Sequence, residues 1–227
     1  MQSAAEKLLD LILPQRCVAC DAVGAQLCES CLERLPRIRG SLCARCGAPT
    51  EWPVERCREC SGRRLAFASA RAAVAYDRTV RALVRSWKEQ GLRRLVEVAA
   101  AVVVETVPRP DVQALTFVPP DWERRLRRGH HPPERLAREL AVGWELPLVS
   151  LLDHTRRIEH QRDLPREARR KNVAGAFRAT KRVPARIALV DDVYTSGATV
   201  SAAASALRVA GARRVDVVTL ARAIRSG

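Results

Sequence analysis

Residues 187–199 read Ile-Ala-Leu-Val-Asp-Asp-Val-Tyr-Thr-Ser-Gly-Ala-Thr, and this stretch decides the fold. Its four leading apolar residues are typical of a strand buried on both faces, as in a parallel sheet. The alanine-rich residues 199–210 that follow predict a helix. The turn between them therefore lies at a helix N-terminus, where free backbone N–H groups and the helix dipole favour a phosphate.

Side chains around this turn point to the same chemistry. Thr195, Ser196 and Thr199 offer hydroxyl donors, and a glycine among them lets the backbone approach an anion closely. Asp191 and Asp192 precede them, which indicates a ligand with hydroxyl groups about one sugar away from its phosphate. An ordinary buried strand with an Asp-Asp turn and a capped helix is the alternative interpretation.

All thirteen positions resemble the ribose-5-phosphate recognition motif of the type I phosphoribosyltransferases. The resemblance implies that Asp191 and Asp192 bind the 2- and 3-hydroxyls of phosphoribosyl pyrophosphate, directly or through Mg²⁺. It also implies that the 5-phosphate is held by Thr195, Ser196, Gly197, Ala198 and Thr199. Some purine-salvage relatives carry an aspartate general base within this loop. Thr195 stands at that position here, so no obvious base is present.

Length and composition bound the possibilities. The 227 residues can hold one medium α/β domain and a small module, and an apolar content of 47% supports a core. A net charge of +15 favours polyanionic partners such as nucleotides, pyrophosphate or nucleic acid. However, only four of the 40 basic residues are lysine, an arginine bias that a GC-rich genome would also produce. Aromatic residues at 4% argue against an extended base-stacking platform.

No segment approaches the roughly 18–20 apolar residues of a membrane span. The short apolar run at residues 8–13 is interrupted by Asp10, and no small-residue cleavage site follows it. We therefore expect neither a membrane span nor a secretory signal, and we expect a cytoplasmic protein.

All eight cysteines lie within the first 60 residues. They form four C-x-x-C pairs: Cys17 and Cys20, Cys28 and Cys31, Cys43 and Cys46, Cys57 and Cys60. Each pair can offer two thiolates to one tetrahedral metal, which predicts two closed four-cysteine zinc sites of structural type. We favour the first four cysteines on one zinc and the last four on another. An interleaved arrangement and a redox role for one pair are the alternatives.

The cysteine-rich segment is short and has few large apolar residues, so metal must stabilise it. Zinc binding on the order of 10 kcal/mol is enough to drive such a module to fold. We therefore predict a first domain over residues 1–62, comprising an N-terminal helix and a double zinc ribbon. A phosphoribosyltransferase-like domain follows over residues 63–227, with residues 61–65 as a hinge.

The second domain alternates strands and helices, which predicts an α/β fold with an open parallel sheet and helices on both faces. Strands are expected at residues 70–76, 115–118, 147–152, 187–190 and 215–220. Helices are expected from residue 79, capped by Asp77, and over residues 92–106, 134–144 and 199–210.

A second anion site is predicted after the strand at residues 115–118, which runs into Pro119-Pro120-Asp121. In the phosphoribosyltransferase architecture a loop at this place takes the pyrophosphate, which implies contacts with Pro120 and Arg128. Guanidinium groups hold phosphate oxygens bidentately, and a crowd of them follows: Arg124, Arg125, Arg127 and Arg128. A solvated basic helix face is the alternative. His130 and His131 are expected as surface loop residues rather than metal ligands.

Residues 154–181 are polar and basic without a sustained apolar period, and they are too many for an ordinary connection. Such a segment is typical of a lid that excludes water from a reacting group. A disordered or partly stranded surface excursion is the alternative interpretation.

The whole chain resembles the ComF family, phosphoribosyltransferase-like proteins linked to DNA uptake in natural competence. The apolar opening before the cysteines is similar to that family's start, and residues 87–91 (Trp-Lys-Glu-Gln-Gly) match its lysine and glycine after a helix. Residues 128–134 match its R-G-F-N-x-A-E segment in part, since histidine replaces the aromatic residue. The lid spacing is kept by Gln161, Leu164, Arg169, Asn172, Gly175 and Phe177.

This resemblance implies a protein of DNA uptake that binds phosphoribosyl pyrophosphate with Mg²⁺ and carries two structural zinc ions. A carboxylate pair beside the ribose would stabilise the positive charge that develops as pyrophosphate leaves. Because no base is evident, the sequence leaves open whether the protein is a phosphoribosyltransferase. The alternatives are a non-catalytic sensor of phosphoribosyl ligands and a zinc-ribbon adaptor for single-stranded DNA or competence proteins.

Overall fold

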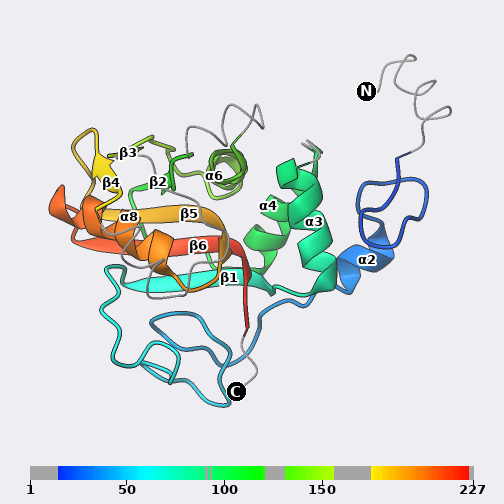
Figure 1. Ribbon diagram of the computed structural model, residues 1–227, viewed down its shortest axis with the longest axis horizontal. Coiled ribbons are helices and arrows are strands. Elements are labelled where there is room, and N and C mark those ends of the chain that lie inside the picture. Colours follow the sequence, from blue (N-terminus) through cyan, green and yellow to red (C-terminus); the bar gives the residue numbers. More distant parts are fainter. Residues whose placement is uncertain (1–14, 90–91, 93, 121–130, 156–174, 225–227) are drawn as a thin grey trace.

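The computed structural model describes residues 15–89, 92, 94–120, 131–155 and 175–224. Its centre is a four-stranded, wholly parallel sheet in the order β1-β6-β5-β2 (Figure 1). The strands are β1 (Ser69–Ala75), β2 (Ala114–Phe117), β5 (Arg186–Tyr194) and β6 (Arg214–Arg222). The predicted α/β class with an open parallel sheet is confirmed.

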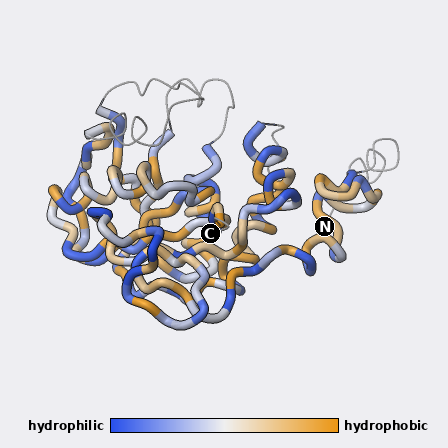
Figure 2. The backbone as a smooth tube through the Cα atoms, turned by 60° about the horizontal axis from the view of Figure 1, so that its bottom comes forward, coloured by the Kyte–Doolittle hydropathy of each residue, from blue (hydrophilic) through white to orange (hydrophobic). Residues whose placement is uncertain are grey.

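Helices cover both faces of this sheet. The helices α4 (Leu95–Thr106) and α6 (Pro132–Gly143) pack on one face, and α8 (Ala198–Val209) packs on the other (Figure 1). Strand β5 serves both cores because its successive side chains alternate between faces. Ala188 and Val190 join the α4 and α6 core, whereas Ile187 and Leu189 join the α8 core, and all four are fully buried. Figure 2 shows apolar segments concentrated in these central elements.

Helix α3 (Arg78–Glu89) follows β1 and packs beside α4. Asp77 Oδ1 accepts a hydrogen bond from the Val80 N–H at 2.8 Å, which confirms the predicted N-terminal cap. The predicted apolar face is buried and comprises Val80, Leu83, Val84 and Trp87. This packing fixes the direction in which the last turn of α3 points.

The strand predicted at residues 147–152 is wrong. Leu148 makes a single parallel bridge to Leu115, and the regular strand β3 (Leu152–His154) begins only at the end of that run. Proline at position 147 lacks the N–H that a ladder requires, so apolar character alone does not continue the pairing. Strand β3 instead pairs antiparallel with β4 (Phe177–Ala179).

The pairing of β3 with β4 joins the two ends of the predicted lid, so the segment is partly stranded. Three predicted features lie outside the described residues. They are the N-terminal helix, residues 121–130 with Arg128, and the middle of the lid at residues 156–174.

The two cysteine segments occupy different places. The first, which includes the short helix α2 (Glu29–Glu33), lies beside α3, and the second lies below β1 (Figure 1). Residues 61–65, predicted as a hinge, are held by side-chain hydrogen bonds. Arg45 donates to the Leu65 carbonyl at 2.5 Å, and Arg63 donates to the Ser196 carbonyl. The second cysteine segment is therefore tied to the sheet domain.

Candidate functional site

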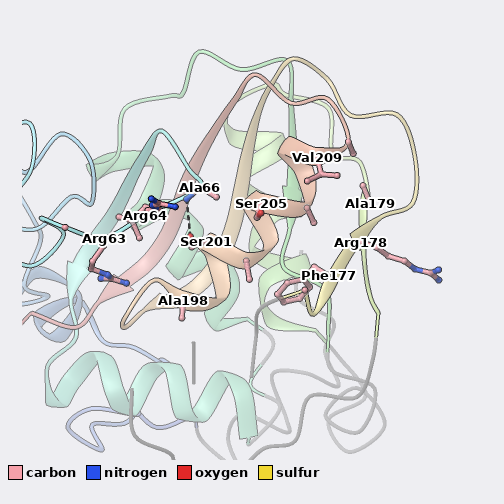
Figure 3. Close-up of a pocket in the computed structure, with 16 residues that line it drawn as sticks. Arg63, Arg64, Ala66, Phe177, Arg178, Ala179, Ala198, Ser201, Ser205 and Val209 are labelled. Carbon is pink, nitrogen blue, oxygen red and sulfur yellow. Dashed lines mark hydrogen bonds between the residues drawn. The ribbon is translucent and has the colours of Figure 1, made fainter. Parts of the chain in front are cut away.

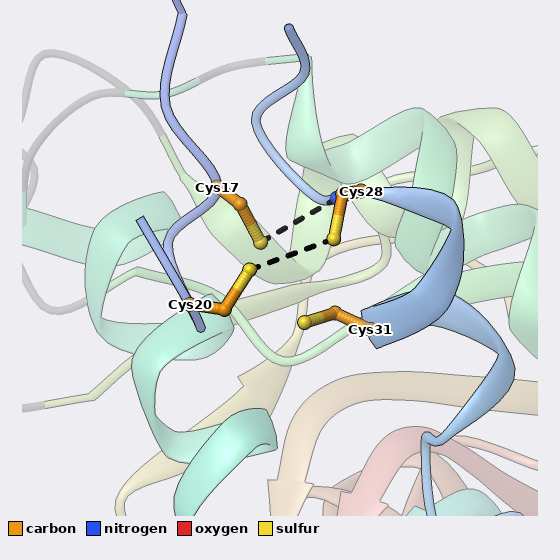
Figure 4. A group of neighbouring side chains, drawn as sticks. All are labelled: Cys17, Cys20, Cys28 and Cys31. Carbon is orange, nitrogen blue, oxygen red and sulfur yellow. Dashed lines mark hydrogen bonds between the residues drawn. The ribbon is translucent and has the colours of Figure 1, made fainter. Parts of the chain in front are cut away.

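The eight cysteines form two separate clusters, and in each the four Sγ atoms lie within 4.8 Å of one another. The clusters are Cys17, Cys20, Cys28 and Cys31 (Figure 4), and Cys43, Cys46, Cys57 and Cys60. Neighbouring sulfurs are 3.6 Å apart for Cys20 and Cys28, and 3.5 Å apart for Cys46 and Cys57. Tetrahedral zinc with Zn–S bonds of about 2.3 Å requires sulfurs roughly 3.8 Å apart. The geometry therefore confirms two four-cysteine zinc sites with sequential pairing.

Backbone N–H groups prepare the first cysteine of each site for metal. Cys28 N–H points at Cys17 Sγ at 3.5 Å, and Cys57 N–H points at Cys43 Sγ at 3.3 Å. Burial raises the pKa of the Cys17 and Cys43 thiols, but these and neighbouring hydrogen bonds outweigh it. They lower the pKa of Cys17 to about 6 and that of Cys43 to about 7. Because zinc binds thiolates, both cysteines are ready ligands at neutral pH.

The acidic pair lies at the carboxyl end of β5, with the loop and α8 directly after it. Asp191 Oδ1 accepts a hydrogen bond from the Asp192 N–H at 2.9 Å, and Asp192 is only 9% exposed. Burial raises the pKa of Asp191 to about 7, and the neighbouring Asp192 charge adds to the rise. Because two neighbouring carboxylates repel each other, a shared proton, a cation or hydroxyl donors between them would stabilise the pair.

Lys88, in the last turn of α3, reaches this pair. Its Nζ lies 2.5 Å from Asp192 Oδ2, and its charge lowers the pKa of Asp191 against the effects of burial and Asp192. The sequence placed Lys88 only within a family motif and did not predict this contact. One feature of the sequence could have indicated a role for Lys88. The chain has 40 basic residues but only four lysines, and one of these lysines lies at the end of an amphipathic helix.

The loop after β5 turns at Gly197, whose φ of 72° favours glycine. A Cβ at this position would lie 2.3 Å from the hydroxyl oxygen of Tyr194, so the space also excludes a larger residue. Ser196 Oγ accepts a hydrogen bond from the Ala198 N–H at 3.3 Å at the start of α8. The predicted residues Thr195 to Thr199 thus surround the N-terminus of a 12-residue helix.

The predicted pyrophosphate loop begins at the end of β2, on the same edge of the sheet as the acidic pair. Pro120 is half-buried, and the preceding Pro119 carbonyl lies 3.2 Å from His154 Nε2 of β3. His154 was not predicted here; it links the loop to the β3-β4 hairpin. Arg128, the other predicted contact, lies outside the described residues.

His131 is not the surface loop residue that was predicted. Its Nδ1 accepts a hydrogen bond from the Glu134 N–H at 3.3 Å and so caps α6, whose first turn contains two prolines. The matching position of the family motif carries asparagine, a preferred N-cap residue. Histidine keeps the acceptor that the helix start requires.

Comparisons with known proteins match the cysteine module and find relatives over most of the chain. The double zinc ribbon domain matches residues 8–61, which contain both cysteine clusters. Competence protein F of Haemophilus influenzae is 26% identical over 211 residues, covering 87% of this chain and 90% of that protein. Competence protein ComFC of Bacillus subtilis is 26% identical over 210 residues, covering 87% and 84%. DNA utilization protein YhgH of Salmonella typhi is 27% identical over 212 residues, covering 87% and 91%. Over most of its length the chain is therefore similar to proteins named for competence and DNA utilization.

A groove of about 940 Å³ runs along the outer side of α8 (Figure 3). Residues 62–66 form one wall, β4 forms the other, and the floor consists of alanine and serine side chains of α8. Arg63, Arg64 and Arg178 supply positive charge, whereas neither Asp191 nor Asp192 lines the groove. The groove is therefore distinct from the acidic pair. Among the described residues, no helix is long and apolar enough to cross a membrane.

The Lys88 contact leads to a pH-dependent prediction. Folded Asp191 holds its proton up to about pH 7, well above its ordinary pKa of 3.8, so stability falls as the pH rises between these values. In Lys88→Met the pKa of Asp191 should rise further. The carboxyl group of Asp191 should then ionise at higher pH than in the wild type. An NMR titration of its side-chain carboxyl signal from pH 4 to 10 would measure this shift.

Arg85→Met is the matched control, since Arg85 lies on the same helix and pairs with the exposed Glu89 at 3.2 Å. That variant should show the wild-type pH dependence. An unchanged midpoint in Lys88→Met would contradict the electrostatic role assigned to Lys88.

Proposed function

We propose that this protein binds phosphoribosyl pyrophosphate with Mg²⁺ at the carboxyl edge of its sheet and acts in DNA uptake during natural competence. One observation carries the proposal. The half-buried Asp191 and the buried Asp192 lead directly into a glycine-containing loop at the N-terminus of α8. The names of the relatives, competence and DNA utilization proteins, support the cellular role.

The parts of the site match the parts of this ligand. Asp191 and Asp192 would hold the ribose hydroxyls, directly or through Mg²⁺, since carboxylate oxygens are ligands that Mg²⁺ prefers. The loop at residues 195–199 would hold the 5-phosphate at the positive end of the helix dipole. The Tyr194 hydroxyl, buried against Gly197, has no hydrogen-bond partner among the described residues. A buried donor of this kind favours an acceptor nearby.

Lys88 supplies a cation beside the carboxylates. A bound Mg²⁺ would supply charge neutralisation for a departing pyrophosphate. Lys88 Nζ, which pairs with Asp192, could instead pair with a phosphate oxygen of the ligand. The carboxylates then face the positive charge that develops on the sugar. No loop residue from Thr195 to Thr199 can act as a strong base. The proposed reaction therefore requires an acceptor that is already nucleophilic, and without one the site serves as a sensor.

The test is calorimetry of the wild type with phosphoribosyl pyrophosphate and Mg²⁺, followed by pyrophosphate release with a panel of nucleobases and amines. Binding with release identifies a phosphoribosyltransferase, and binding without release identifies a sensor. Absence of binding to both phosphoribosyl pyrophosphate and ribose 5-phosphate would reject the ligand.

The groove favours a second candidate function, binding of single-stranded DNA as a zinc-ribbon adaptor. Its arginine-bearing walls suit a phosphate backbone. Arg64→Ala should weaken binding of a labelled oligothymidine more than Arg208→Ala, since Arg208 is exposed on α8 but does not line the groove. Equal losses in both variants, with a steep salt dependence, would indicate only a basic surface.

A further inference from the structure

The second zinc site is joined to the last strand of the sheet by one buried side chain, Arg222. This residue ends β6 and is 2% exposed. Its Nη1 donates to the Cys46 carbonyl at 2.5 Å, and its Nη2 lies 3.7 Å from Cys46 Sγ and donates to the Glu59 carboxylate. One guanidinium thus binds two residues of the second cysteine segment, one of which is a zinc ligand.

The same guanidinium lies over the ring of Tyr194, 4.6 Å from its centroid. This is the geometry of a cation–π contact, which is strengthened by burial. Tyr194 is 3% exposed, and Phe67 packs edge-on against it from the segment that follows the second site. The ring is therefore packed between two side chains, Arg222 and Phe67, that both contact residues of the second cysteine segment.

Tyr194 in turn supports the phosphate loop. Its hydroxyl oxygen lies so close to Gly197 that a Cβ there would be 2.3 Å away. The ring therefore sets how near the backbone of Gly197 can approach the sheet. The chain of contacts runs from Cys46 through Arg222 and Tyr194 to the loop.

A second route reaches the same loop. Arg63 donates to the Ser196 carbonyl, and its own N–H bonds to the Cys60 carbonyl at 3.2 Å. The Ala66 N–H donates to Ser201 Oγ of α8 at 3.1 Å. Both routes begin at ligands of the second zinc site or directly after them.

The first zinc site provides a contrast. The cavity beside it is lined by residues 16–21 together with Ser86 and Leu92, so its surroundings are α3 and the chain after it. Arg16 there pairs with the exposed Asp21 at 3.0 Å. No described contact joins this pair to the loop at residues 195–199.

We propose that Arg222 is a positioning residue through which the second zinc site holds the phosphate loop in its binding geometry. The first zinc site has no such role. The effect of Arg222 on ligand binding rests on the proposed function. Its effect on the conformation of the loop at residues 195–199 does not, and it can be measured without ligand.

The test compares Arg222→Gln, Arg222→Lys and the control Arg16→Gln by hydrogen exchange of the loop amides in the ligand-free, zinc-loaded protein. Loss of one charge-assisted hydrogen bond should speed exchange at residues 195–199 by about tenfold in Arg222→Gln. Arg222→Lys should restore part of the protection because lysine keeps the charge and can donate, but it lacks the planar fork that lets arginine reach Glu59 and Cys46 together. Arg16→Gln should exchange like the wild type. Affinity for ribose 5-phosphate should follow the same order.

Zinc content by elemental analysis accompanies each variant. Unchanged loop exchange in Arg222→Gln would overturn the inference. If that variant loses zinc, Tyr194→Leu decides the matter, because it breaks the chain of contacts outside the cysteine segment. Wild-type exchange in Tyr194→Leu would then reject the inference. If the exchange results are as expected but the wild type does not bind ribose 5-phosphate, the proposed ligand fails and the positioning role stands.

Discussion

The double substitution Asp191→Asn with Asp192→Asn is expected to lower the affinity for phosphoribosyl pyrophosphate with Mg²⁺ by at least about 100-fold. Each carboxylate contributes charge-assisted hydrogen bonds worth about 1.5–3 kcal/mol, and every 1.4 kcal/mol is about tenfold in affinity. Asparagine keeps the size of each side chain but removes both charges that would hold the ribose hydroxyls or the metal. Calorimetric titration of both proteins measures the difference.

The same double variant should remain folded, because removing the crowded charges offsets the loss of the ion pair between Lys88 and Asp192. Both carboxylates are crowded in a site where burial and mutual repulsion raise the pKa of Asp191 to about 7, so removing their charges relieves this cost at neutral pH. Thermal unfolding measured beside the titration therefore separates loss of binding from loss of folding.

Asp153→Asn is the control, since Asp153 is an exposed carboxylate of β3 whose nearest cation, Arg178, lies 3.8 Å away. It should bind like the wild type. Equal affinity in the Asp191 and Asp192 double variant and in the wild type would remove these residues from the proposed site.

Cys60→Ser is expected to reduce the zinc content from two ions per chain to one and to unfold much of the protein. Cys43 and Cys60 are fully buried, and they share a core with β5, β6 and α8. Structural zinc sites contribute about 10 kcal/mol or more, whereas the whole stability of a domain is about 5–15 kcal/mol. Loss of this site therefore removes stability comparable to that of the domain. Elemental analysis and circular dichroism at increasing temperature measure both effects.

Cys20→Ser is the matched substitution at the first site. Cys20 is exposed, but Cys17 and Cys31 share a core with α3, α4 and β5. The same loss of one zinc should therefore disturb the first cysteine segment and also lower the stability of the sheet domain. A wild-type protein that is folded, free of metal and disulfide-bonded would contradict both expectations.

Local patterns of residues in the sequence predicted much of the structure. The apolar run, the acidic pair and the glycine of residues 187–199 predicted a strand, a loop and a helix, and β5 and α8 lie there. Such predictions succeed because neighbouring residues determine burial pattern, capping and backbone conformation over a few turns. The same reasoning failed at residues 147–152, where Leu151 and Leu152 are buried but the run makes a single bridge, from Leu148 to Leu115, before β3 begins. Periodicity reports burial, but it does not report the pairing partner.

The cysteine spacing also left one question, the pairing of the C-x-x-C units, undecided. Four C-x-x-C pairs identified all eight ligands, but either a sequential or an interleaved pairing satisfied the spacing. Only the positions of the sulfur atoms assign Cys17 to Cys31 to one site and Cys43 to Cys60 to the other. Ligand chemistry is local, whereas the partner of each pair depends on the path of the chain between them.

The sequence by itself determined the ligand types, the strand-loop-helix unit at residues 187–199 and the α/β class. Only the tertiary structure decided that Lys88 meets Asp192, and that Arg222 meets Cys46 across 176 positions of the chain. Both contacts depend on the strand order β1-β6-β5-β2, which brings the ends of distant strands to one edge. Strand order is set by the packing of whole elements against each other, and no residue pattern along the chain encodes it directly.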